Sequence, residues 1–147
     1  MRLDSLIEWY ETLSPESLSD ITEIYHEHAS FQDPFNDVQG LEAISNIFRH
    51  MFENTHKPRF WIISSEAQGD VAWLTWQFEF VLANRQHSIA GASRLLFSED
   101  GRVTQHRDYW DATELFAKLP IVGTITRHLK KRLGTTHYKP RAFTANL

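Results

Sequence analysis

Cysteine is absent from this 147-residue sequence. Disulfides, thiolate nucleophiles and metal sites built on cysteine are therefore excluded. No apolar run approaches the ~20 residues that a membrane-spanning helix needs. The first residues already include Asp4 and Glu8, which a signal peptide would not carry. These absences lead us to expect a cytoplasmic protein.

Acidic residues are missing from the end of the chain. All 19 lie at or before Glu114, whereas seven of the 15 Lys and Arg residues follow it. The net charge of −4 therefore combines an acidic body, which repels nucleic acid, with a basic C-terminal segment. Apolar and basic residues alternate over residues 113–133, which predicts one or two amphipathic helices. Such a segment either closes over its own domain or makes a weak contact with an anionic surface.

Aromatic residues are abundant, at 13% of the chain with 5 Trp and 10 Phe. They can fill a core, line a pocket or cover a subunit interface, and composition leaves these three roles open. The length fits one domain. We expect that domain to span residues 1–133, followed by a loose tail at 134–147 that has no periodic apolar stripe.

Helical spacing of apolar residues predicts three helices in the first part of the chain, over about residues 3–13, 18–28 and 41–52. Between the last two, Asp33-Pro34 disfavours helical geometry and predicts a short irregular segment over residues 29–35. Gly40 immediately precedes the third helix.

Strand-like patterns follow over residues 59–67, 71–82, 87–97 and 103–111, separated by three tight turns. Apolar and polar side chains alternate most clearly over residues 71–82, as in an antiparallel strand with one face against a core. Helices grouped before strands predict an α+β fold. Three N-terminal helices would pack on one face of a curved, mainly antiparallel sheet of four or five strands.

Three features in this order resemble the SnoaL-like and ketosteroid-isomerase-like branch of the nuclear transport factor 2-like superfamily. They are the sequence FQDPF at residues 31–35, GLEAI at residues 40–44, and the hairpin at residues 96–103 that leads into DYWD at residues 108–111. The resemblance covers about residues 3–111. It implies a cone-shaped, cystatin-like fold with a hydrophobic pocket at its wide end. It also implies a homodimer paired through the sheet, where Trp73 and Tyr109 would face outward.

The resemblance implies that Asp33 is a general base, because it matches the aspartate that moves a proton next to a carbonyl in ketosteroid isomerases. A desolvated carboxylate is a stronger base. The alternative is that Asp33 only braces the Asp-Pro turn. The isomerase's oxyanion-hole tyrosine aligns with Trp9, with Tyr10 out of register, and its protonated aspartate aligns with Ser93. Steroid isomerisation is therefore not expected.

A second polar group is His106-x-Asp108-x-Trp110. Alternation along a strand places these three residues on one face, and the resemblance places that face in the pocket. His106 would act as acid or base near neutral pH, with Asp108 or Asp33 orienting it. The alternative is a structural network in which the two groups satisfy each other.

The remaining candidates are pocket walls and polar contacts for a small apolar ligand. These substrate-binding residues are Trp9, Phe35, Trp61, Trp76, Phe78, Ser93 and Trp110. We expect no cofactor, because nucleotide and phosphate motifs are absent. We expect no metal either, since His26 and His28 would point apart on a helix.

Three function classes remain open from the sequence. The first is a cofactor-independent isomerase, cyclase, dehydratase or epoxide-hydrolase-like enzyme in which Asp33, His106 and Asp108 are catalytic. The second is a carrier or sensor in which the same groups only set the polarity of the pocket. The third is an interaction module that uses the sheet or the basic segment.

Overall fold

The structure is a computed structural model that describes residues 2–117, 125, 127–128 and 131–133. The chain divides into two compact units, Met1–Trp110 and Asp111–Leu147. The first unit contains every candidate site residue named above.

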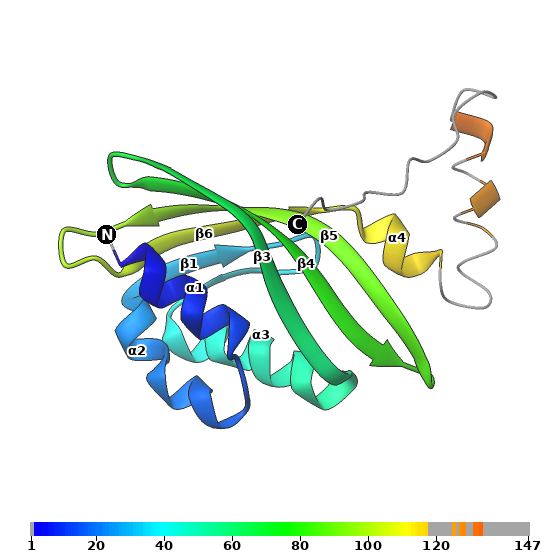
Figure 1. Cartoon of the computed structure of the whole chain (residues 1–147), viewed down its shortest axis with the longest axis horizontal. Helices are drawn as coiled ribbons and strands as arrows, with labels where there is room; N and C mark the ends of the chain where they lie inside the picture. Colours follow the sequence, from blue (N-terminus) through cyan, green and yellow to red (C-terminus); the bar gives the residue numbers. More distant parts are fainter. Residues whose placement is uncertain (1, 118–124, 126, 129–130, 134–147) are drawn as a thin grey trace. The chain divides into compact units, whose positions relative to one another are not determined.

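The helices of the first unit form where apolar residues recur at helical spacing. They are α1 (Leu3–Glu11), the 3₁₀ turn η1 (Glu16–Asp20) with the short α2 (Ile21–Ile24), and α3 (Leu41–Asn54). Each buries its apolar stripe, for example Ile44 and Phe48 of α3. These helices lie on one side of the sheet (Figure 1).

Six strands form one open, curved sheet in the order β2-β1-β6-β5-β4-β3. They are β1 (Tyr25–Gln32), β2 (Asp37–Gln39), β3 (His56–Gln68), β4 (Val71–Leu82), β5 (Arg85–Phe97) and β6 (Val103–Trp110). Every neighbouring pair is antiparallel except β1 and β6, which are parallel. The predicted α+β class and the mainly antiparallel, curved sheet are confirmed.

The prediction of a second helix over residues 18–28 is wrong beyond Ile24. Residues from Tyr25 to Gln32 form β1, which pairs with β2 on one side and β6 on the other. Two ladders of backbone hydrogen bonds outweigh a helical periodicity that is only a weak local preference. The sheet consequently has six strands instead of four or five, and the irregular segment shrinks to a turn after Gln32.

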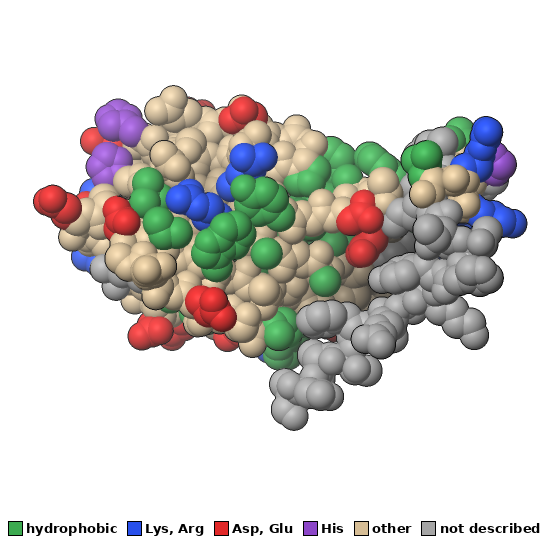
Figure 2. All heavy atoms as spheres, turned by 90° about the horizontal axis from the view of Figure 1, so that it is seen from above, with side chains coloured by type: hydrophobic (Ala, Val, Ile, Leu, Met, Phe, Trp, Pro, Cys, Tyr) green, Lys and Arg blue, Asp and Glu red, His purple; other side chains and the backbone are tan. Residues whose placement is uncertain are grey.

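The outer face of the sheet, opposite the helices, carries exposed aromatic side chains. Trp73 and Tyr109 are 44% and 43% exposed, and their rings stack with centroids 5.8 Å apart. Figure 2 views this face and shows hydrophobic side chains next to basic ones. The pairing of two copies through this face stays a prediction.

The second unit is described only in part. Helix α4 (Ala112–Phe116) begins after Asp111, whose carboxylate accepts a hydrogen bond from the Thr113 backbone N–H. Helical residues also occur at 125, 127–128 and 131–133. Within these ranges and residues 2–117, no helix has the length and apolar character needed to cross a membrane. The predicted tail at 134–147 lies outside the described residues.

The packing of α3 predicts that the loss of stability on truncating an isoleucine to alanine depends on how deeply that isoleucine is buried. Ile44 is fully buried, whereas Ile47 is only half-buried. Ile44→Ala should lower the free energy of unfolding by about 2–5 kcal/mol, because a buried isoleucine leaves a cavity when truncated. Ile47→Ala, the matched control with the same helix-propensity change, should cost clearly less. Urea denaturation measures both, and equal losses would contradict the packing described for this helix.

Candidate active site

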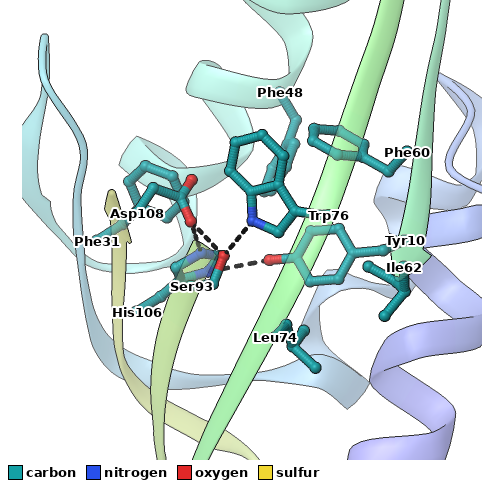
Figure 3. Close-up of a pocket in the computed structure, with 10 residues that line it drawn as sticks. All are labelled: Tyr10, Phe31, Phe48, Phe60, Ile62, Leu74, Trp76, Ser93, His106 and Asp108. Atoms are coloured by element: carbon teal, nitrogen blue, oxygen red, sulfur yellow. Dashed lines mark hydrogen bonds and ion pairs between the residues drawn. The ribbon is translucent and has the colours of Figure 1, made fainter. Parts of the chain in front are cut away.

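A small cavity lies between the helices and the inner face of the sheet. Its volume is about 20 Å³, enough for a water molecule. Figure 3 shows the lining side chains, which come from α1, α3 and five strands of the sheet. They are Tyr10, Phe31, Phe48, Phe60, Ile62, Leu74, Trp76, Ser93, His106 and Asp108. The walls are thus apolar and mainly aromatic, and the polar groups gather at one end.

Asp108 is the centre of the polar end. Its Oδ1 accepts a hydrogen bond from Ser93 Oγ at 2.5 Å and one from His106 Nε2 at 2.6 Å. Ser93 Oγ in turn accepts from Trp76 Nε1 at 2.8 Å. The register of β5 and β6 places Ser93 directly opposite Asp108, so the sheet itself holds the two side chains together (Figure 3).

Two tyrosines complete the network from the other side of His106. The Tyr25 hydroxyl lies 2.6 Å from His106 Nδ1 and the Tyr10 hydroxyl lies 2.9 Å from it. The two hydroxyls also contact each other. Tyr10 comes from α1 and Tyr25 from β1, and His106 is only 3% exposed between them. The polar end is therefore one connected chain from Trp76 to the tyrosine pair.

Burial also sets the protonation of the tyrosines. It raises the pKa of Tyr25 above the usual value of a phenol, and it raises the pKa of Tyr10 with further help from the neighbouring Tyr25 and Asp108. Both hydroxyls consequently keep their protons across the physiological range and remain hydrogen-bond donors. A neutral imidazole of His106 that donates to Asp108 from Nε2 would have one lone pair at Nδ1, which accepts from one of the two hydroxyls.

Gly91 gives Trp76 its place in the cavity wall. A Cβ atom at position 91 would lie 2.3 Å from the Trp76 ring, which is closer than any real contact. Glycine is therefore required on β5 so that the indole can lie against the strand and reach Ser93.

A profile described as the SnoaL-like domain matches residues 6–106. The chain belongs to the SnoaL-like family. No protein with a curated description matches the sequence. Among solved structures, the chain is similar to a putative SnoaL-like polyketide cyclase from Jannaschia sp. CCS1, with a TM-score of 0.70, 10% identity, and 80% of this chain and 92% of that chain covered.

Two further structures are similar to this SnoaL-like chain. One is a nuclear transport factor 2-like protein of unknown function from Burkholderia pseudomallei K96243, with a TM-score of 0.69, 15% identity, and coverage of 78% of this chain and 93% of that one. The other is an epoxide hydrolase from M. tuberculosis, with a TM-score of 0.64, 13% identity, and coverage of 86% and 92%. At these identities the likeness shows the nuclear transport factor 2-like fold alone.

Four of the sequence-predicted site residues meet in the cavity of this SnoaL-like domain. They are His106, Asp108, Ser93 and Trp76. Sequence reasoning missed the two tyrosines that bond to His106. Their signal was available, because a tyrosine on a buried apolar stripe needs a partner for its hydroxyl.

Trp9 and Trp61 lie outside the cavity. Trp9 is buried in the core, where its Nε1 donates to the Ser17 carbonyl at 3.0 Å. The residue of α1 that reaches the cavity is its neighbour Tyr10, which the alignment had placed out of register. Trp61 faces the outer side of the sheet and its Nε1 donates to Glu79. The alternation of β3 turns Phe60 and Ile62 inward instead, which corrects the expectation of Trp61 as a wall.

Three further predicted substrate-binding residues do not line the cavity: Phe78, Phe35 and Trp110. Phe78 is half-buried on the inner face and stacks on Phe60 with ring centroids 4.5 Å apart. Phe35 is 54% exposed and meets the edge of Trp110 at 5.4 Å. Trp110 lines a shallow groove of about 270 Å³ that also borders Asp108.

Asp33 braces the turn that follows β1. Its Oδ1 accepts from the backbone N–H groups of Phe35 and Asn36, both at 2.7 Å, and the Asn36 side chain donates to both carboxylate oxygens at 3.0 Å. The neighbouring Pro34 and Phe35 are exposed, so these two side chains do not enclose the carboxylate of Asp33 in apolar surroundings. Asp33 lines the groove beside Asp108, and its catalytic role stays a prediction.

The expectation that His26 and His28 point apart on a helix is wrong. Both lie on β1 instead of a helix, and their ring centroids are 5.8 Å apart. Within the described part of the chain, no group of three or more potential ligands surrounds a point where a metal ion would sit.

The buried tyrosines predict a loss of stability in alkali. A raised pKa in the folded state favours the neutral phenol, so the stabilisation is complete below about pH 10, the value for an unfolded tyrosine, and declines as pH rises above it. Tyr25→Phe should weaken this decline, and Tyr109→Phe, which removes the hydroxyl of an exposed tyrosine outside the network, is the matched control. Urea denaturation from about pH 8 to about pH 11.5 measures both. The same pH dependence in the two variants would contradict the assignment.

Proposed function

We propose that this domain binds a small apolar molecule with one oxygen function in the cavity and converts it by cofactor-free acid–base chemistry. One observation carries the proposal: the ionisable pair His106–Asp108 lies at the end of a cavity whose other walls are almost entirely apolar. Enclosing such a pair costs free energy. The hydrogen bonds from Ser93 and the tyrosines offset part of that cost and fix the geometry.

Asp108 takes the role of base in this proposal. Only its Oδ1 accepts from Ser93 and His106, and within the described residues no group donates to Oδ2. Its side chain is 16% exposed, against 2% for the side chain of His106. Asp108 is therefore the ionisable group of the pair with a free oxygen and access to a ligand. Asp33, whose Oδ1 accepts three hydrogen bonds in its turn, has less freedom to act.

A ligand larger than a water molecule requires a side chain to move. The cavity of about 20 Å³ is far smaller than the several hundred Å³ of a typical ligand site. Trp76 is the largest lining side chain, and one hydrogen bond to Ser93 holds its polar atom. We propose that ligand entry displaces this indole and exchanges its hydrogen bond with Ser93 for one from the ligand.

The names of similar structures support an enzyme of this general kind. They include a putative polyketide cyclase and an epoxide hydrolase. Because the fold accommodates several activities, the choice of reaction rests on the residues of the site. A carrier would use the same cavity without turnover, and the following experiment separates the two.

The decisive comparison is between binding and turnover in Asp108→Asn. The full chain is screened against small ketones, phenols and epoxides, with tryptophan fluorescence for binding and NMR for conversion. Asp108→Asn should lower turnover by about 10²–10⁴-fold, the range for loss of a general base, while binding weakens only modestly. Asp70→Asn, an exposed turn residue, is the matched control.

Binding without turnover by the wild-type protein would favour the carrier. Equal turnover in wild type and Asp108→Asn would remove Asp108 as the base and reopen the case for Asp33.

A further inference from the structure

A polar groove lies on the outer face of the sheet, opposite the helices. This outer groove has a volume of about 360 Å³, which is within the range of small-molecule sites. Strands β1, β2, β5 and β6 line it with two arginines, two glutamines, an aspartate, a serine and a tyrosine. His106 also borders it, although its ring bonds to Asp108 and the tyrosines on the inner side. Unlike the apolar inner cavity, the outer groove is therefore suited to a polar ligand.

Two arginines lie directly opposite each other in the outer groove. The register of β5 and β6 pairs Arg94 with Arg107, and side chains at such a pair share one face, with Cβ atoms about 4.5–5.5 Å apart. Figure 2 views this face and shows basic side chains beside hydrophobic ones. Arg94 is half-buried, so water does not fully surround its charge. Because like charges in this arrangement destabilise a sheet, an anion bound between them would stabilise it.

The chain itself provides no counter-ion for this pair. Among the described residues 2–117, which include all 19 acidic side chains, none forms an ion pair with Arg94 or Arg107. Within the same range, neither guanidinium takes part in a side-chain hydrogen bond. Asp37 borders the groove, but its carboxylate lies beyond ion-pair distance of both arginines. The compensating charge is thus left to an anion from outside the chain.

The guanidinium of Arg107 is already held in place. Its central carbon lies 4.9 Å from the centroid of the Tyr109 ring, which stacks on Trp73. A cation–π contact of this kind positions the guanidinium before a ligand arrives. Each arginine presents a fork of N–H donors that matches a phosphate or a carboxylate. A phosphate monoester has three terminal oxygens and a charge of about −1.5 to −2 near neutral pH, so it satisfies two opposed forks better than a carboxylate does.

The rest of the outer groove suits hydroxyl groups. Arg107, Gln32 and Asp37 are successive register partners across β6, β1 and β2. At a strand spacing of about 4.8 Å, Asp37 lies about 10 Å from Arg107. A ligand whose phosphate contacts the arginines therefore extends towards an amide and a carboxylate, which both accept hydrogen bonds from hydroxyls. Asp37 repels a bare anion but favours an anion that also brings donors.

We propose that the outer groove binds a small hydroxylated phosphate monoester, such as a sugar phosphate. Its phosphate lies between Arg94 and Arg107, and one of its hydroxyls donates to Asp37. The acidic body of the chain repels large polyanions and anionic membrane surfaces, which favours a small soluble ligand. This site is separate from the inner cavity and does not depend on the function proposed for it.

Isothermal titration calorimetry of the full chain with glucose 6-phosphate tests the site. Wild-type protein should bind it, whereas glucose, which lacks the phosphate, should not bind. Arg94→Gln and Arg107→Gln should each weaken binding by about 10–100-fold, the effect of losing hydrogen bonds to a charged group. Arg59→Gln is the matched control and should bind as wild type does. Arg59 also lies over an aromatic ring, that of Trp61 at 3.6 Å, but its register partner is Glu79 instead of a second arginine.

Two further variants test the geometry of the site. Arg107→Lys keeps the charge but loses the fork, so its affinity for glucose 6-phosphate should still fall. Asp37→Ala should lower the ratio of the affinity for glucose 6-phosphate to that for inorganic phosphate. The substitution removes an acceptor for hydroxyls, while the repulsion that it relieves acts on both ligands alike. An unchanged ratio would overturn the placement of the hydroxyl against Asp37.

The remaining outcomes overturn the proposal in distinguishable ways. No binding of glucose 6-phosphate by the wild-type protein, or equal affinity in wild type and Arg94→Gln, would remove the phosphate site. Binding to vesicles that contain phosphatidic acid, without binding of glucose 6-phosphate, would assign the arginines to a lipid headgroup. A dimer in sedimentation experiments that Arg94→Gln alters and that excludes glucose 6-phosphate would show that a second copy covers the groove. Circular dichroism shows whether each variant folds.

Discussion

The contact between His106 and Asp108 is the interaction on which the arrangement of this domain depends. It places two ionisable groups among aromatic side chains, where an unpaired charge would be strongly destabilising. Three neighbouring elements contribute hydrogen bonds that compensate it: α1 and β1 provide the tyrosines, and β5 provides Ser93. Removing one partner would leave the others buried without their hydrogen bonds. The polar end of the cavity is therefore a single cooperative unit.

Close packing around this unit determines what the cavity admits. Trp76 fills much of the space and lies against Gly91, where even a methyl group would collide with it. The same indole donates to Ser93 and so belongs both to the wall and to the polar network. Movement of Trp76 would therefore both enlarge the cavity and break the hydrogen bond to Ser93.

The two aspartates of this SnoaL-like domain differ in the hydrogen bonds that their carboxylates accept. Asp33 follows β1 and uses its carboxylate to close a turn. Asp108 lies within β6, and among the described residues only its Oδ1 accepts hydrogen bonds. The same groove borders both residues. Family membership and a shared fold leave this division open, because it depends on which local hydrogen bonds each carboxylate makes.

The sequence determined the features that depend on near neighbours. The alternation of apolar and polar residues gave the bounds of β4 correctly at both ends. Turn residues placed the hairpins, and because side chains two residues apart on a strand share a face, the sequence also placed His106 and Asp108 on one face. It misassigned Tyr25, because helical periodicity ignores the strands that later pair with β1. Only the tertiary structure brought Tyr10 and Tyr25 to His106, across 96 and 81 residues of sequence. Periodicity records how one segment meets an apolar surface, whereas the partner of a buried hydroxyl is decided by how distant segments pack together.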